Sequence, residues 1–244
     1  MTKVLSGLYL LYCATIFILL MIIVLPFTLF ASALLKKTPA KRTILFLLRC
    51  WAWCFSILSG FWFKTYNKNN INVSKQHIYV GNHGSYLDAV AVCIAIPQHF
   101  SPLGKIEMTK IPIFGSIYKR IVVMIDRNSK ESREFSVNQL KQEIADGQSI
   151  LIFPEGTMNK NNAELTEFYD GAFRIAIETQ TDILPFVMIN NRKLLPRINP
   201  LNAKPGFVKT VFIHPVPVKN LTLADVPNLK NQVFELMKNA ILAD

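Results

Sequence analysis

One histidine and one aspartate stand at a spacing that suits acid–base chemistry. Residues 82–88 read Asn-His-Gly-Ser-Tyr-Leu-Asp and follow an apolar run at 78–81. Imidazole exchanges a proton near neutral pH, so His83 can take the proton of an attacking hydroxyl. A carboxylate such as Asp88 can orient the ring and stabilise the imidazolium that forms. The structural alternative is that His83 only packs, while Asp88 favours the first turn of a helix through the helix dipole.

Two further polar stretches directly follow apolar runs. Asp126-Arg127 comes after the run 121–125, and Pro-Glu-Gly-Thr at 154–157 comes after 149–153. Ligands of α/β sheets gather beyond the carboxyl ends of the strands, so the three polar loops are expected to meet at one pocket. Arg127 would bind a phosphate with two parallel hydrogen bonds, or it is a surface arginine paired with Asp126.

The third loop and one lysine complete the expected pocket. Glu155, Gly156 and Thr157 form either an ordinary turn after a strand or a loop that contacts phosphate and hydroxyl groups. Gly156 would let the backbone approach a ligand closely. Lys105, in the Gly-Lys-Ile-Glu stretch 104–107, offers a second positive charge that can face the pocket.

Other catalytic chemistries lack their motifs. The chain contains no Gly-x-Ser-x-Gly nucleophile motif, and its histidines at 77, 83, 99 and 214 show no metal-ligand spacing. The four cysteines at 13, 50, 54 and 93 lie in apolar segments and are expected to be reduced. The economical reading is a His–Asp pair that activates the hydroxyl of the substrate itself, without metal or cofactor.

The surrounding pattern predicts an α/β fold. Short apolar runs at 78–81, 121–125, 149–153, 183–189 and 208–213 predict strands. Segments 86–96, 131–146, 171–179 and 228–242 predict helices. This alternation predicts a mixed, mostly parallel sheet with flanking helices.

The N-terminal region is strongly apolar. No charged residue occurs from Val4 to Leu35, which is longer than the roughly 20 residues a helix needs to cross a bilayer. Pro26 is expected to kink or break this helix. A second apolar stretch, 44–63, is interrupted by Arg49 and rich in tryptophan, so either both stretches span or they form a hairpin in one leaflet. We expect membrane helices at 1–66 and an α/β catalytic domain at 67–244, with 67–72 as the linker.

The charge distribution supports the same location. The net charge is +11, and lysines and arginines lie beside the apolar segments at 36, 37, 41, 42 and 64. Such flanks suit an anionic membrane surface and favour the cytoplasmic side. A bacterial inner membrane fits this pattern. No nucleic-acid-binding motif accompanies the charge, so nucleic acid is not an expected partner.

Taken together, these motifs resemble the glycerolipid acyltransferases, specifically the bacterial 1-acyl-glycerol-3-phosphate acyltransferases. The motifs that carry the resemblance occur in order over about residues 75–218: Asn-His-x4-Asp at 82–88, Gly-Lys-x-Glu at 104–107 leading to Ile-Asp-Arg at 125–127, Phe-Pro-Glu-Gly-Thr at 153–157, and Ile-Leu-Pro-Phe at 183–186.

The resemblance implies an activity and residue roles. His83 would be the general base for the sn-2 hydroxyl of lysophosphatidic acid, with Asp88 orienting it. Acyl-CoA or acyl carrier protein would donate the acyl group without an acyl-enzyme, giving phosphatidic acid for phospholipid biosynthesis. A second set of residues matches positions tied to the acceptor or the pocket: Lys105, Arg127, Glu155, Gly156 and Thr157.

Two departures from the family pattern keep other acceptors open. Met158-Asn159 precedes Lys160 where relatives often carry a basic residue, and Tyr169 stands where many carry a lysine. Another lyso-lipid, such as a lyso-amino-lipid or a lysophospholipid, is therefore an alternative acceptor. A membrane lipid hydrolase with the same pair would use water in place of the acceptor. A non-catalytic lipid-binding protein would not need His83 or Asp88.

Overall fold

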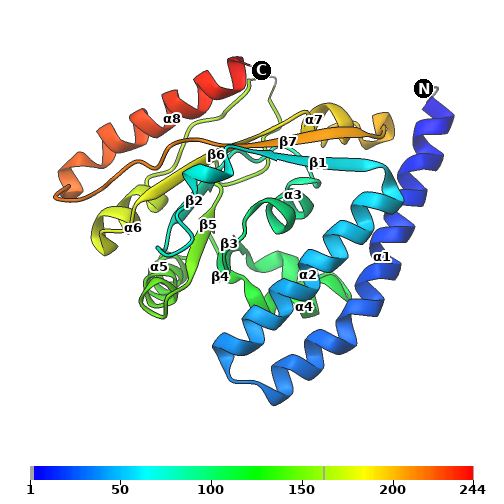
Figure 1. Ribbon diagram of the computed structural model, residues 1–244, viewed down its shortest axis with the longest axis horizontal. Helices are drawn as coiled ribbons and strands as arrows, with labels where there is room; N and C mark the ends of the chain where they lie inside the picture. Colours follow the sequence, from blue (N-terminus) through cyan, green and yellow to red (C-terminus); the bar gives the residue numbers. More distant parts are fainter. Residues whose placement is uncertain (1–2, 162, 244) are drawn as a thin grey trace.

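A seven-stranded sheet organises the chain from residue 61 onward (Figure 1). The computed structural model describes residues 3–161 and 163–243. The strands are β1 (Phe61–Tyr66), β2 (Ile78–Gly81), β3 (Phe100–Lys105), β4 (Val123–Ile125), β5 (Ser149–Ile152), β6 (Ile183–Ile189) and β7 (Gly206–Phe212). Their spatial order is β1-β7-β6-β2-β5-β3-β4. Every neighbouring pair is parallel except β6 and β7, so the expected mixed, mostly parallel sheet is confirmed.

Helices cover both faces of this sheet. One face carries α3 (Asp88–Ala95) and α4 (Phe114–Ile121), with the N-terminal pair α1 (Lys3–Leu34) and α2 (Lys37–Ser59) beyond them. The other face carries α5 (Lys130–Ala145), α6 (Gly171–Thr179) and α8 (Val226–Leu242). The short α7 (Asn191–Leu194) follows β6.

The central strands are buried on both faces because their side chains alternate. On β2, Tyr79 packs into the core under α2 and α3, while Ile78 and Val80 pack into the core under α5 and α6. The same alternation separates Leu151 from its neighbours on β5. Near-continuous apolar runs are therefore what these strands require, and the ends of the strands are left to carry polar residues.

The N-terminal helices form a hairpin packed on the α/β part. Phe17 of α1 packs edge-on against Trp51 of α2, with ring centroids 5.0 Å apart. Both helices are long and apolar enough to cross a membrane by length and composition. Helix α1 continues through Pro26, so of the two expected effects of this proline, a kink or a break, the break is not found.

Arg49 has a local structural partner that the sequence did not reveal. Its guanidinium donates hydrogen bonds to the carbonyl oxygens of Cys93, Ile96 and Pro97, at the carboxyl end of α3. The carbonyls of Cys93 and Ile96 are among those that a helix end leaves without partners. Arg49 therefore joins the N-terminal hairpin to the helix that starts at Asp88.

Residues 61–66, which we placed with the membrane helices, form an edge strand of the sheet. β1 pairs in parallel with β7, from Phe61 opposite Gly206 to Tyr66 opposite Val211. The second apolar helix ends at Ser59, where Gly60 adopts a left-handed conformation with φ 73°. The chain therefore enters the sheet before the polar segment 67–72, and not after it.

Candidate active site

His83 and Asp88 form a hydrogen-bonded pair at the carboxyl end of β2. His83 Nδ1 lies 2.8 Å from Asp88 Oδ2. The His83 ring stacks on Phe153 with centroids 4.4 Å apart. The His83 side chain is 24% exposed and that of Asp88 is 0% exposed. When Nδ1–H donates a hydrogen bond to the carboxylate, Nε2 is the nitrogen left to accept a proton from a substrate.

Asp88 is a buried carboxylate whose oxygens are fully used. Oδ2 also accepts hydrogen bonds from the backbone N–H groups of Gly84 and Ser85, at 2.8 and 3.0 Å. Oδ1 accepts one from Asn191 Nδ2. A buried carboxylate has lost its hydrogen bonds to water, and these donors replace them. The loop 83–85 and the first residue of α7 thus hold the aspartate in one orientation.

Asn82 and Glu155 fix the loop that carries His83. Asn82 exchanges two hydrogen bonds with the backbone of Met188 on β6. Glu155 Oε1 accepts the His83 backbone N–H at 2.7 Å, and Oε2 accepts both the backbone N–H and the hydroxyl of Thr166. Burial raises the pKa of the Glu155 carboxyl, and these hydrogen bonds oppose that rise. The first and third polar loops therefore meet, as expected from their strand ends.

The carboxylate of Glu155 is used inside the protein. We predicted a substrate-binding role for this residue, but both its oxygens contact the chain itself and it is 3% exposed. Its visible contribution is to hold the backbone of His83 against the loop 154–157.

Gly156 and Arg127 lie beside this loop. Gly156 has φ +70°, and a Cβ placed there would lie 2.6 Å from the ring of Tyr169 and 3.2 Å from Arg127 Nη1. The second polar loop thus also reaches the pocket. Burial lowers the pKa of the Arg127 guanidinium, while Tyr169, Glu107 and Tyr118 act in the opposite direction. The alternative interpretation, a pairing of Arg127 with Asp126, is not among the ion pairs of the described residues.

Lys105 and Thr157 are the most exposed members of the predicted set. Lys105 ends β3 opposite Ile125, the last residue of β4, and Arg127 follows two residues later, so both lie at the same edge of the sheet. Both Lys105 and Thr157 are exposed at the carboxyl edge of the sheet. Within residues 3–161 and 163–243, no group of three or more His, Cys, Asp or Glu side chains is placed to hold a metal ion.

Asn191 is the site residue that we did not predict. It is 2% exposed and donates to Asp88 from a position 103 residues away in sequence. The signal was present, because Asn-Asn at 190–191 directly follows the apolar run 183–189 as the other polar loops follow theirs. The structure thus adds the segment after β6 to the strand ends that we expected to form the site.

The family model described as acyltransferase matches residues 62–189, which is over half of the chain, and the chain belongs to that family. The resemblance noted in the sequence is thereby confirmed.

Relatives that are named for their activity support membership of the same family. The chain is 30% identical over 166 residues to the 1-acyl-sn-glycerol-3-phosphate acyltransferase of Haemophilus influenzae, covering 67% of this chain and 68% of that protein. It is 30% identical over 141 residues to a protein of the same name from Chlamydomonas reinhardtii, covering 57% of this chain and 42% of that one. The match to the mouse alpha enzyme spans 58% of that protein.

A solved structure has the same fold. The crystal structure of the 1-acyl-sn-glycerophosphate (LPA) acyltransferase from Thermotoga maritima superposes with a TM-score of 0.78 at 22% identity. The superposition covers 98% of this chain and 94% of that one, so the fold likeness includes the N-terminal hairpin.

Proposed function

We propose that this protein is a membrane-associated 1-acyl-sn-glycerol-3-phosphate O-acyltransferase. It would transfer a fatty acyl group from acyl-CoA or acyl carrier protein to the sn-2 hydroxyl of lysophosphatidic acid. The observation that carries the proposal is the hydrogen bond of 2.8 Å between His83 and the buried Asp88 in a chain of the acyltransferase family. The activity for which the relatives are named supports this choice of acceptor and reaction.

The proposed reaction needs one proton relay. Nε2 of His83 takes the proton of the acceptor hydroxyl as its oxygen attacks the carbonyl carbon of the thioester. Asp88 stabilises the imidazolium that forms. The carbon–sulfur bond then breaks, and the proton on His83 passes to the leaving thiolate. The products are the diacyl lipid and the free thiol, and no acyl-enzyme is required.

The acceptor phosphate would lie on the β3–β4 side of the dyad. Lys105 and Arg127 both lie at the carboxyl edge of these neighbouring strands. Arg127 lies beside Gly156, since its Nη1 would be 3.2 Å from a Cβ placed there, and Gly156 belongs to the loop that holds His83. A cationic pair at this point would place the phosphate of lysophosphatidic acid while its hydroxyl approaches His83.

The proposed location is the cytoplasmic face of a membrane. The exposed apolar surface of α1 and the basic residues at the turn between α1 and α2 support it. A lyso-lipid and its acylated product both partition into lipid, so a membrane-bound catalyst meets its acceptor directly.

An acceptor panel tests the proposal. Purified protein in vesicles receives a labelled acyl donor with lysophosphatidic acid, glycerol 3-phosphate, lysophosphatidylcholine or a lyso-amino-lipid. We expect product with lysophosphatidic acid, and a loss of at least about a thousandfold in kcat for His83→Ala. Unchanged turnover of His83→Ala would contradict the dyad. Transfer only to a zwitterionic or uncharged acceptor would contradict the phosphate assignment, and fatty acid release without acceptor would indicate a hydrolase.

A further inference from the structure

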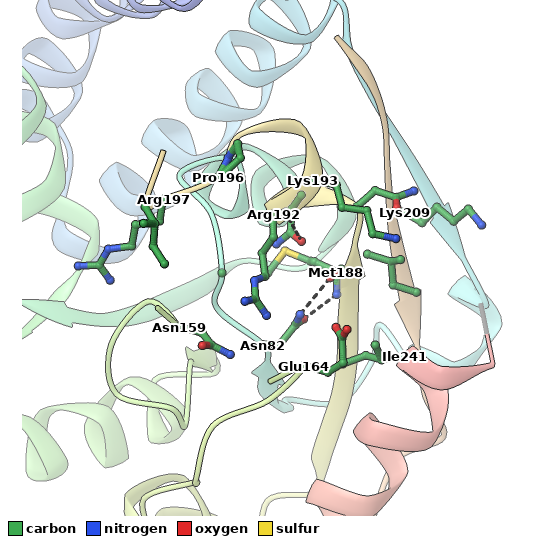
Figure 2. Close-up of a pocket in the computed structure, with 15 residues that line it drawn as sticks. Asn82, Asn159, Glu164, Met188, Arg192, Lys193, Pro196, Arg197, Lys209 and Ile241 are labelled. Atoms are coloured by element: carbon green, nitrogen blue, oxygen red, sulfur yellow. Dashed lines mark hydrogen bonds between the residues drawn. The ribbon is translucent and has the colours of Figure 1, made fainter. Parts of the chain in front are cut away.

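A cavity of about 600 Å³ lies on the β6 side of His83 (Figure 2). Its wall includes Asn82 and Gly84, the two neighbours of His83 in sequence. The rest comes mainly from the end of β6, from α7 and the residues after it, and from β7. Arg192 extends between Asn82 and Asn159 in this cavity. Its aliphatic stem covers Gly84, where a Cβ would lie 2.5 Å from Arg192 Cγ.

The cavity is strongly cationic. Arg192, Lys193 and Arg197 line it, as does Lys209, and Glu164 is the acidic member of the lining. Arg197 donates to the carbonyl oxygen of Met158 at 2.6 Å, and Arg192 donates to those of Asn161 and Ala163. These acceptors are neutral, so the hydrogen bonds position the guanidinium groups without balancing their charge.

Lys193 is the cation best placed to meet a ligand. It is exposed and forms no ion pair with any residue in 3–161 or 163–243. Apolar walls from Met188, Ile189 and Ile198 accompany the charges. A concave site with several cations concentrates a polyanion, and apolar walls strengthen the field inside.

The strand order separates this cavity from the proposed acceptor site. β2, which carries His83, lies between β6 on one side and β5, β3 and β4 on the other. Lys105 and Arg127 follow β3 and β4, whereas Arg192, Lys193 and Arg197 follow β6. Two anionic groups can therefore approach the dyad from opposite sides without competing for the same cations.

We propose that the cationic cavity beside β6 binds the phosphate groups of a nucleotide thioester, the acyl donor of the reaction. This inference rests on the proposed function and identifies the acyl donor as an acyl-coenzyme A. The phosphates of coenzyme A are separated from the thioester by a long pantetheine arm. Phosphates held at the exposed Lys193 would leave this arm to extend along the cavity toward Asn82 and Gly84, so that the acyl group reaches His83 from the side opposite the acceptor.

Binding of coenzyme A itself tests the site without turnover. Isothermal titration of the purified full chain in detergent gives the Kd of coenzyme A for wild type, Lys193→Glu and the control Lys219→Glu. Lys219 is exposed in the connection after β7 and does not line the cavity. We expect Lys193→Glu to weaken binding about fivefold or more, and the equal charge change at Lys219 to leave it within about twofold. Lys193→Ala, with a smaller expected loss, covers the case that the glutamate variant does not fold.

Steady-state kinetics then separate the donor from the acceptor. Lys193→Glu should raise KM for acyl-CoA and leave KM for lysophosphatidic acid unchanged. Three outcomes would each overturn the proposal. The first is an equal loss of coenzyme A affinity in Lys193→Glu and Lys219→Glu, and the second is a rise in KM for the acceptor alone. The third is wild-type protein that binds acyl carrier protein but not coenzyme A. Because coenzyme A binding needs no acceptor, failure of the acceptor panel alone would reject the proposed function and not the donor site.

Discussion

Asp88 explains how a loop histidine is held ready for proton transfer. Its carboxylate is 0% exposed and accepts hydrogen bonds from His83, two backbone N–H groups and Asn191. Each donor removes one direction in which the carboxylate can turn. The orientation of the His83 ring therefore depends on Asp88 and on the groups that hold Asp88 in place.

Asn191 is a positioning residue in this arrangement, and Asn191→Ala should lower kcat. The change leaves Oδ1 of a buried carboxylate without a partner, at a cost of about 1–3 kcal/mol. Asp88 would turn away from His83 to recover a donor, so we expect kcat to fall about tenfold with both KM values within about twofold. Steady-state kinetics of Asn191→Ala, with the exposed Asn199→Ala as control, measure this. A higher KM with unchanged kcat would argue against positioning.

Gly156 carries a second prediction at the residue scale. Its φ of +70° strains any other residue, and a Cβ there would press on the Tyr169 ring and crowd Arg127. We expect Gly156→Ala to lower the free energy of unfolding by about 1–2 kcal/mol and to raise KM for the acceptor. Gly171→Ala is the matched control, because nothing lies within 4 Å of its Cβ position. If Gly156→Ala and Gly171→Ala lower the thermal unfolding temperature equally, the positive φ and the crowded surroundings of Gly156 do not contribute to stability.

The sequence revealed the site residues only where a local motif existed. His83 and Asp88 are five residues apart, and hydrogen-bond chemistry alone suggests their pairing. Asn191 and Glu155 reach the same loop from 103 and 72 residues away. That proximity arises from the order of β6, β2 and β5, which a single sequence does not state.

At the scale of elements, Glu143 joins three segments. Its carboxylate accepts hydrogen bonds from Lys41 at the start of α2, at 2.6 Å, and from Ser101 of β3, at 2.7 Å. Lys37 lies 3.0 Å away. Glu143 is 3% exposed. An ion pair at the start of α2 therefore ties the N-terminal hairpin to the α/β part, whereas β1 follows the other end of α2.

Glu143→Gln should destabilise the protein in a pH-dependent way. Burial acts to raise the pKa of Glu143, but hydrogen bonds from Lys41, Ser101 and Lys37 outweigh it and leave the pKa below the usual value of about 4.5. The stabilisation is therefore complete above that usual value and is lost as the pH falls through the lowered pKa. We expect a loss of about 3 kcal/mol at neutral pH, because Lys41 keeps a buried charge without its partner.

Denaturant unfolding of wild type and Glu143→Gln at several pH values checks this. The difference in unfolding free energy should narrow below pH 4.5. Glu134→Gln on the same helix is the control, because its contact with Lys130 is exposed and 4.0 Å long. A difference that stays constant with pH would show that Glu143 acts through packing and not through its charge.

Elements with regular patterns were predictable, and irregular ones were not. The strand 183–189 and the helix 171–179 agree with β6 and α6. β3 was missed because Pro102 and Gly104 interrupt its apolar pattern, although Pro102 lies opposite Leu151 in the sheet. β1 was missed because its residues continue the apolar run of α2 and only the left-handed Gly60 separates them.

At the scale of the whole molecule, one surface remains apolar outside the core. Much of the side of α1 facing away from α2 consists of exposed large apolar residues, including Leu19 and Ile23, which are 54% and 59% exposed. A soluble surface rarely carries so large a patch. The hairpin joins the α/β part through β1, Arg49 and Glu143, so the patch and the His83 site belong to one folded body.

The double change Leu19→Glu/Ile23→Glu should therefore release the protein from membranes. A charged side chain in the hydrocarbon region costs about 2.5–3.5 kcal/mol, so two on one helix face cost about 5–7 kcal/mol. We expect the fraction that sediments with phospholipid vesicles to fall steeply. Acylation of a lyso-lipid dispersed below its micellar concentration should fall much less, because the dyad lies elsewhere.

The control carries the same charges on other exposed apolar positions. Val73→Glu/Phe135→Glu changes residues that are 65% and 62% exposed and lie outside the hairpin. This variant should sediment with vesicles as wild type does. If both double variants stay bound, charge attraction or another surface holds the protein to lipid. If both are released, added negative charge is sufficient and the apolar face of α1 has no special role. Only release of the hairpin variant alone places the membrane contact on α1, on the same body that holds His83.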